Sequence, residues 1–556
     1  MKQVMQSEIF SRDSDLLQGV PMDKKVLKGA AVIGIAGVIV KLLGACFRIP
    51  LTNWIGADGM SYYGFAYAIY GALIILATAG VPVAISRMVS ENIALKRYKN
   101  AHKVFRVSMI IMVALGAVLF LISFFGAGFL MKLFGNPDAA LAVRAISPAL
   151  FLVPIVSTFR GYFQGRQNMN PTAISEITEQ IIRIAVGLAL AAHFISTGYI
   201  EAAAGATFGA TCGAMAALCV IFIIYVLNHR VIEYKIEKND PTIEPFGRIA
   251  SKMLTIAIPI IIGSMVSPIM NILDTAIIMR RLQATGFSYE QSKHLFGLIS
   301  SYCSTLIGFP QIFTQAVAIS LVPAVSRSMA LNNISEVREN TKLGYRLTML
   351  LAFPCAFGLF FLAQPILLLL YGSRPDEVAE AVPTLMIMAV GIIGLALSQT
   401  STGVLQAIGK QNIPLRNLAV AMVVKVALTF VLVGINSLNI KGAALSTLVA
   451  YMISFVLNDV SIKRLTGTAV DVLQTYVKPC AASVAMALAA LAVYKIMRLA
   501  AGNTVSALVA VIVGVIVYAV LVVAVKIVTP GELEQIPGGG RLNRVISKFV
   551  RWEQND

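Results

Sequence analysis

The segment RGYFQGRQNMNPTAISEITEQIIRI, residues 160–184, separates two long apolar blocks and mixes turn residues with charged ones. Gly161 and Gly165 loosen the end of the first block, and Pro171 suits the first turn of a helix, where its missing N–H costs nothing. The arginines around these glycines indicate a cytoplasmic turn, because short cytoplasmic loops of membrane proteins are rich in Lys and Arg. The segment therefore predicts a tight hairpin between two membrane-spanning helices.

The rest of the chain is as apolar as the blocks beside this hairpin. Of 556 residues, 58% are hydrophobic and 13% are charged, which is too apolar for a soluble protein. About fourteen apolar stretches are close to the ~20 residues that a helix needs to cross a bilayer. We expect spans at residues 29–52, 62–86, 107–131, 145–163, 172–193, 202–228, 253–279, 296–322, 347–371, 381–407, 414–434, 442–458, 479–494 and 503–525.

Two pairs of similar segments indicate an internal repeat. VPVAISR, ending at Arg87, resembles VPAVSR, ending at Arg327, and GYFQG followed by NMNP resembles GVLQA followed by QNIP. Both pairs are offset by about 240 residues, as expected for two six-helix halves with two further helices. The fold class predicted is an all-α polytopic membrane protein of two six-helix lobes plus two C-terminal helices. Chance similarity of short apolar motifs is the alternative.

The expected domain boundaries follow from this plan, and they are a cytoplasmic segment 1–28, an N-lobe 29–228, a linker 229–252, a C-lobe 253–464, helices thirteen and fourteen in 465–528, and a basic tail 529–556. Most of the 45 Lys and Arg residues then lie on one side, which places both termini in the cytoplasm of a cell-membrane protein. The net charge of +18 is spread over many short loops, so anionic lipid headgroups are expected neighbours and nucleic acid is not.

Other functional classes find little support in the sequence. The first apolar block carries Lys41 and Arg48 where a cleavable signal has an uninterrupted core. The six cysteines show no C-x-x-C spacing and the four histidines are scattered, so neither a disulfide framework nor a metal site is expected. The outer loops are short, and no phosphate loop or nucleophile elbow is found. We therefore expect no enzyme activity and no cofactor.

Residues 160–184 closely resemble the signature of the stage V sporulation protein B family of polysaccharide transporters, within the multidrug, oligosaccharidyl-lipid and polysaccharide exporter superfamily. The resemblance covers nearly the whole chain, and relatives of this family include lipid II flippases. It implies that the protein moves an undecaprenyl-pyrophosphate-linked sugar precursor across the membrane. It also implies that the last two helices shape a groove for the lipid tail.

The first span carries residues suited to a pyrophosphate. Gly37, Lys41, Gly44 and Arg48 are spaced by about one helical turn each and share one face. Each cation placed in a span costs about 2.5 to 3.5 kcal/mol, so both need a wet cavity, a counter-ion or an anionic ligand. The alternative is that they snorkel to the membrane surface or pair internally. Lipid II flippases also carry cations in this helix, with one residue fewer between them, and an arginine in span two, where this chain has three tyrosines.

Spans seven and eight supply further polar candidates. In span seven, Ser264, Ser267, Asn271 and Asp274 recur at helical spacing, and Asp274 is expected to balance a cation in the empty cavity. Span eight carries a stripe that suits sugar hydroxyls and amides, or close helix packing. The substrate-binding residues predicted are Lys41, Arg48, Asp274, Ser301, Ser304, Gln311 and Gln315.

The function predicted is a flippase that moves a lipid II-like precursor of peptidoglycan or spore cortex from the inner to the outer leaflet by alternating access. The expected partners are this lipid, membrane lipids and cell-wall or cortex synthases, and the protein is expected to be a monomer. One alternative is a drug or cation antiporter of the same superfamily, which favours intramembrane carboxylates. Another is a scaffold for the synthases, whose activity does not depend on the cavity.

Overall fold

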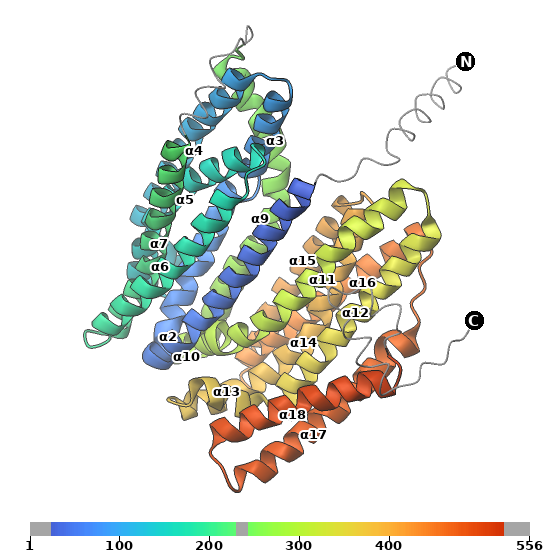
Figure 1. The fold of residues 1–556 in the computed structure, drawn as a ribbon. Coiled ribbons are helices and arrows are strands. Elements are labelled where there is room, and N and C mark those ends of the chain that lie inside the picture. The colour runs from blue at the N-terminus through green and yellow to red at the C-terminus, as the bar shows by residue number, and fades with distance from the viewer. Residues whose placement is uncertain (1–23, 229–242, 528–556) are drawn as a thin grey trace.

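The computed structural model describes residues 24–228 and 243–527, and all regular structure in these ranges is helical (Figure 1). Most of the predicted N-terminal segment 1–28, the larger part of the linker 229–252 and the whole tail 529–556 lie outside the described residues.

The helices follow one another through short turns. They are α2 (Lys24–Thr78), α3 (Val81–Ala94), α4 (Tyr98–Leu133), η1 (Pro137–Ala139), α5 (Ala140–Gly165), α6 (Asn170–Phe194), α7 (Tyr199–Leu227), α9 (Phe246–Ala284), α10 (Tyr289–Gly297), η2 (Leu298–Cys303), α11 (Ser304–Ala330), α12 (Ile334–Phe361), α13 (Ala363–Tyr371), α14 (Pro375–Ala407), α15 (Asn412–Val433), α16 (Ile440–Thr466), η3 (Leu473–Val477), α17 (Lys478–Arg498) and α18 (Asn503–Ala524).

The polytopic all-α prediction is confirmed. Thirteen described segments are long and apolar enough to cross a membrane, and the first of them, Ala36–Ala94, joins two helices across Gly56. Gly56 has a φ of 62°, a left-handed conformation that residues with a Cβ rarely adopt. The helices often extend beyond the expected spans: α4 begins at Tyr98, whereas the sequence predicts residue 107. A helix can continue through polar residues outside the hydrocarbon layer. A search for apolar stretches does not detect these extensions.

Two groups of helices form separate bundles that lean against each other (Figure 1). Helices α2 to α7 form the first bundle, and α11 to α16 form the second. Helix α9 runs beside α2 and α3 of the first bundle and also contacts α15 of the second. Helices α17 and α18 pack on the outside of the second bundle, where the Tyr518 hydroxyl donates to the Leu350 carbonyl at 2.8 Å.

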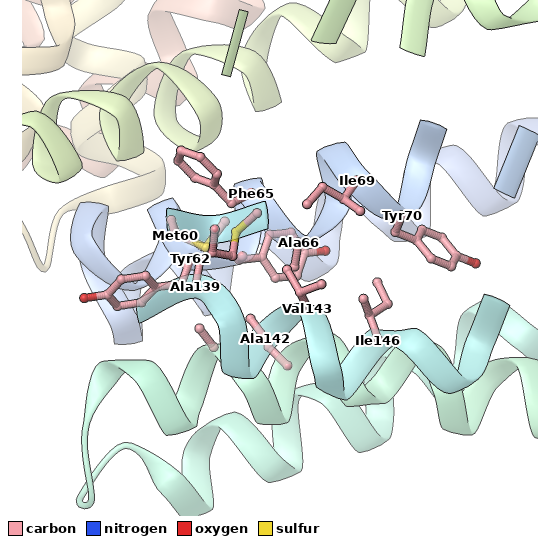
Figure 2. Close-up of a cluster of buried hydrophobic side chains, with 14 of the residues drawn as sticks. Met60, Tyr62, Phe65, Ala66, Ile69, Tyr70, Ala139, Ala142, Val143 and Ile146 are labelled. Carbon is pink, nitrogen blue, oxygen red and sulfur yellow. The ribbon is translucent and has the colours of Figure 1, made fainter. Parts of the chain in front are cut away.

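The core of the first bundle shows why these apolar stretches associate. Tyr62, Phe65 and Ile69 of α2 are all at most 4% exposed and belong to one buried cluster with Val143 and Ile146 of α5 (Figure 2). Transferring these side chains from lipid to protein gains no hydrophobic free energy, so close van der Waals packing supplies the association.

Small residues bring α6 and α7 into close contact. Helix α7 carries glycines at positions 205, 209 and 213, a spacing that aligns them on one face. A Cβ at Gly209 would lie 2.6 Å from the Arg183 carbonyl oxygen, and one at Gly213 would lie 2.5 Å from that of Glu179. The glycines therefore fix the position of the α6 backbone that carries Glu179 and Arg183.

The repeated motifs meet each other in both bundles. In the first bundle, a Cβ at Gly165 would lie 2.7 Å from the Ser86 carbonyl oxygen. At the matching positions of the second bundle, the Ser326 hydroxyl donates to the Ala407 carbonyl oxygen at 3.0 Å. Each motif that begins with VP and ends with SR thus packs on the end of the helix that precedes the hairpin.

The two bundles join at one end, which we call the closed end and which contains Gly56, Trp54 and the α13–α14 turn. The Ala57 N–H donates to Glu377 Oε2 at 2.7 Å, and Arg374 Nη2 donates to the Trp54 carbonyl oxygen at 2.8 Å. The opposite end carries Lys24 of α2, and there the bundles diverge (Figure 1). We call it the open end.

Candidate functional site

A cavity of about 410 Å³ lies between the two bundles. Its walls come from both halves of α2, from α6 and from α11, and its lining residues are Val40, Lys41, Gly44, Ala45, Phe47, Arg48, Tyr63, Tyr67, Gln180, Arg183, Ser304, Thr305, Gly308, Gln311 and Ile312. The structure thus brings together Lys41, Arg48, Ser304 and Gln311 from the residues predicted to bind substrate.

Lys41 reaches across the cavity to the second bundle. Its Nζ donates to Oε1 of Gln315 in α11 at 2.5 Å, so these two predicted residues touch each other. The bond joins a helix of each bundle, and a neutral amide leaves the positive charge of the lysine uncompensated. Lys41 is exposed, and it lies nearer to the open end than Arg48 because α2 begins there.

Arg48 lies about two helical turns further along α2, at the aromatic wall of the cavity. Its guanidinium carbon is 6.0 Å from the centre of the Tyr63 ring, which is within the range of a cation–π contact. Tyr63 in turn stacks on Tyr67 with ring centres 4.4 Å apart. The tyrosines of span two therefore stand beside the cation of span one.

Arg183 of α6 is a third cation in the lining, and sequence reasoning did not place it there. Glu179 and Arg183 are four residues apart, a spacing that favours an ion pair along the helix, and the pair is present at 3.1 Å. The same side chain also borders the cavity. The signal available in the sequence was its position well inside an apolar span, which is costly for a cation that serves only its own helix.

Gly44 lets α2 approach α6 beside these cations. A Cβ at Gly44 would lie 3.3 Å from Nε2 of Gln180, which is tighter than an ordinary contact. Gln180 lines the cavity and accepts from Arg183 Nη1 at 3.3 Å. The glycine therefore keeps room for a polar group that sequence reasoning also missed.

The lining of this cavity is electropositive. Among the described residues that form it, three are cations and none is a carboxylate. Hydroxyl and amide groups of Ser304, Thr305 and Gln311 face these cations from α11. In a site of reduced dielectric, fixed cations and neutral hydrogen-bonding groups favour an anionic ligand that also carries hydroxyls or amides.

Three predicted binding residues lie outside the lining, and one of them is Gln315, which touches the lining residue Lys41. Ser301, in η2, is fully buried, and its hydroxyl hydrogen-bonds that of Thr52 at 2.6 Å, so it joins the bundles at their interface. Asp274 of α9 forms an ion pair with Lys425 of α15, and neither belongs to the residues that border the cavity. The carboxylate expected to balance a cavity cation is therefore paired with another intramembrane cation.

Two protein-family models match this chain. Residues 26–329 match the model of the family described as Polysaccharide biosynthesis protein, and residues 299–431 match that of MatE. The chain is similar to "Lipid II flippase MurJ" of Bacillus subtilis (strain 168), with 26% identity over 74% of this chain and 78% of that protein. It is also similar to "Stage V sporulation protein B" of the same organism, with 26% identity over 73% and 77%.

A solved structure shares the fold. It is described as "Lipid II flippase MurJ, inward closed conformation", has a TM-score of 0.61 and 17% identity to this chain, and the match covers 88% of this chain and 97% of that one. The resemblance drawn from residues 160–184 is therefore confirmed at the level of family and fold.

Proposed function

This chain belongs to the polysaccharide biosynthesis protein family, and on that basis we propose that it flips a polyprenyl-pyrophosphate-linked sugar across the cell membrane. The observation that carries the proposal is the cavity between the bundles, whose three cations face neutral hydroxyl and amide groups. Cations suit the pyrophosphate, and the neutral groups suit the sugar. The relative with the name lipid II flippase supports the same substrate class.

Transport by this proposal proceeds through alternating access of the N-lobe, residues 29–228, and the C-lobe, residues 253–464. The headgroup enters at the open end, and separation of the closed-end contacts releases it on the other side. The lipid tail stays in the bilayer beside α17 and α18, which pack on the outside of the second bundle. No protein group changes covalently, so the protein acts as a transporter and not as an enzyme.

The open end faces the cytoplasm in this proposal, because most Lys and Arg residues were assigned to that side. Each uncompensated negative charge then gains about 2.3 kcal/mol per 100 mV on moving outward. A cysteine at Asn168, an exposed residue of the open-end hairpin, is expected to resist impermeant thiol reagents in intact cells. A cysteine at Thr197, exposed at the closed end, is expected to react, in a background without the six native cysteines. The reverse pattern contradicts the orientation.

The function itself is tested by removing the cavity cations. We expect Lys41→Ala and Arg48→Ala each to block transport nearly as fully as the double variant, because ~10.5 Å along the helix separates the two cations and each serves a different stage of transport. Arg48→Lys retains more function than Arg48→Ala, since it keeps the charge and loses the two-pronged grip on phosphate. Accumulation of lipid-linked precursors in a depleted strain, measured by mass spectrometry at matched membrane levels, reports the result.

Two other functions give different outcomes in this assay. A scaffold for cell-wall or cortex synthases retains activity when both cations are removed. The second is a drug or cation antiporter, which the MatE match at residues 299–431 supports. It predicts drug-stimulated cation exchange in proteoliposomes and no precursor accumulation. The absence of a carboxylate among the described lining residues favours the flippase over the antiporter.

A further inference from the structure

The third cation of the cavity, Arg183, takes part in a network that the proposed function alone does not require. We propose that Arg183 binds a phosphate oxygen of the transported headgroup, and that Arg160 sets the strength of this contact by sharing the carboxylate of Glu179. The inference rests on the proposed function, because it assigns the ligand of the same cavity to a further residue. Arg183 is thus a binding residue, and Arg160 is a positioning residue.

Arg183 has hydrogen-bonding capacity left over. Its side chain is only 18% exposed, Nη2 donates to Glu179 Oε1 at 3.1 Å, and Nη1 donates to Gln180 Oε1 at 3.3 Å. The buried Nε has no hydrogen-bond partner among the residues that the structure describes. A guanidinium offers five N–H donors, and a buried donor without an acceptor is costly. The side chain borders the cavity, and Nη1 and Nη2 each carry a second proton that an anionic oxygen there can accept.

The carboxylate beside Arg183 is shared between two guanidinium groups. Arg160 Nη2 lies 3.0 Å from Glu179 Oε2, whereas Arg183 contacts the other oxygen, Oε1. Arg160 is also fixed by Ser175, whose hydroxyl accepts from Nε at 3.0 Å, and it does not border the cavity. Glu176 lies at the limit of ion-pair distance from Arg160, 4.0 Å from Nη1, so Glu179 is the nearer counter-ion of both guanidinium groups. Because Arg183 shares this counter-ion, it keeps part of its charge for a ligand.

This sharing predicts opposite effects of two nearby substitutions. Arg160→Gln leaves Glu179 to Arg183 alone and removes a positive charge near the cavity, so an anion binds more weakly. Glu179→Gln removes the competing carboxylate, so an anion binds more tightly and is released more slowly. A network that only stabilises the α5–α6 packing predicts loss of stability from both changes and no opposed shift in affinity.

The headgroup chemistry that fits is a pyrophosphate diester with one charge on each phosphate. Arg48 and Arg183 border the same cavity, whereas Lys41 is engaged by Gln315 from the opposite bundle. A planar guanidinium suits the paired oxygens of a phosphate, and a lysine supplies a point charge. We therefore assign the paired contacts to the phosphate oxygens to Arg48 and Arg183.

The test is calorimetric titration of the purified full-length protein with farnesyl pyrophosphate, a short-chain polyprenyl pyrophosphate, with farnesol as the uncharged probe. We expect Arg183→Gln to weaken pyrophosphate binding about tenfold or more, as for loss of a charge-assisted hydrogen bond. Arg183→Lys recovers part of the affinity. Arg160→Gln lowers the affinity, and Glu179→Gln raises it. Lys410→Gln, which removes an exposed cation outside the cavity, leaves it unchanged.

Each outcome separates the inference from the proposed function. If Arg183→Gln binds as tightly as the unsubstituted protein while Arg48→Gln does not, the assignment of Arg183 is wrong and the flippase proposal stands. If the unsubstituted protein binds farnesyl pyrophosphate no more tightly than farnesol, the anionic substrate itself is wrong. If Arg183→Gln does not fold, the affinities of Arg183→Lys, Arg160→Gln and Glu179→Gln for farnesyl pyrophosphate test the inference instead. If Arg160→Gln and Glu179→Gln shift this affinity in the same direction, the sharing of Glu179 is wrong.

Discussion

Single residues inside the membrane follow the rule that a buried charge needs a partner. Arg160, Glu179 and Arg183 form one chain of ion pairs, and Asp274 pairs with Lys425. The Glu179–Arg183 pair follows from the four-residue spacing along one helix. The Asp274–Lys425 pair joins residues 151 positions apart, so no local pattern predicted it. Its members are 17% and 10% exposed, and we expect it to act as a structural pair between α9 and α15.

A substitution at Asp274 tests this structural role. Asp274→Asn leaves Lys425 buried without its counter-ion, and we expect a loss of about 3 to 5 kcal/mol in stability. Asp274→Leu combined with Lys425→Met removes both charges and recovers most of that loss. Thermal unfolding of the purified variants, followed by fluorescence-detected size exclusion, measures the effect. A stable Asp274→Asn protein with altered transport supports the role in cavity balance that the sequence predicted.

At the scale of helices, the contact between α6 and α7 sets the geometry of the site. Glycines 205, 209 and 213 of α7 allow the α6 backbone to approach, and Arg183 projects from α6 into the cavity lining. The Arg183 carbonyl oxygen is the nearest atom to a Cβ at Gly209. The orientation of this binding residue therefore depends on small residues in a neighbouring helix.

Adding one methyl group to this contact is expected to move the site. In Gly213→Ala, the new Cβ meets the Glu179 carbonyl oxygen at 2.5 Å, so α6 shifts away and stability falls by about 1 to 3 kcal/mol. Gly126→Ala in α4 is the matched control, because its nearest neighbour is a Leu130 methyl at 3.8 Å. Melting temperature and farnesyl pyrophosphate affinity are measured together. Equal values for both variants show that α6 does not depend on this contact.

At the scale of the whole molecule, the closed end holds the two bundles in one arrangement. Glu377 is central to it: its carboxylate accepts from the Ala57 N–H and from the Tyr302 hydroxyl at 2.6 Å, and it pairs with Arg374 at 3.1 Å. Glu377 belongs to α14 of the second bundle, Tyr302 to η2, which continues into α11 of that bundle, and Ala57 to the first bundle. Alternating access requires these bonds to break.

Removal of this carboxylate is expected to favour separation at the closed end. In Glu377→Ala, a cysteine at Thr52, which is fully buried at the interface, reacts about tenfold faster with a maleimide, as for loss of a hydrogen bond to a charged group. The background lacks the six native cysteines. Glu290→Ala is the control, because Glu290 pairs with Lys293 of its own helix. An unchanged rate in Glu377→Ala shows that other contacts hold the bundles together.

The sequence alone determined the fold class, the approximate spans and the cation stripe of α2. The reason is that a span must be apolar for about 20 residues and that helical spacing sets which side chains share a face, and both are local properties. The stripe of α11 was local as well, so Ser304 and Gln311 were found from their spacing and do line the cavity.

Only the tertiary structure decided which faces meet. It places Arg183 and Gln180 beside Lys41 and Arg48, moves Ser301 into a hydrogen bond with Thr52, and assigns Asp274 to Lys425. These contacts depend on how helices rotate and pack, which small residues and buried partners distant in the chain determine. A helical period specifies a face, and packing between helices specifies whether that face borders a cavity, another helix or lipid.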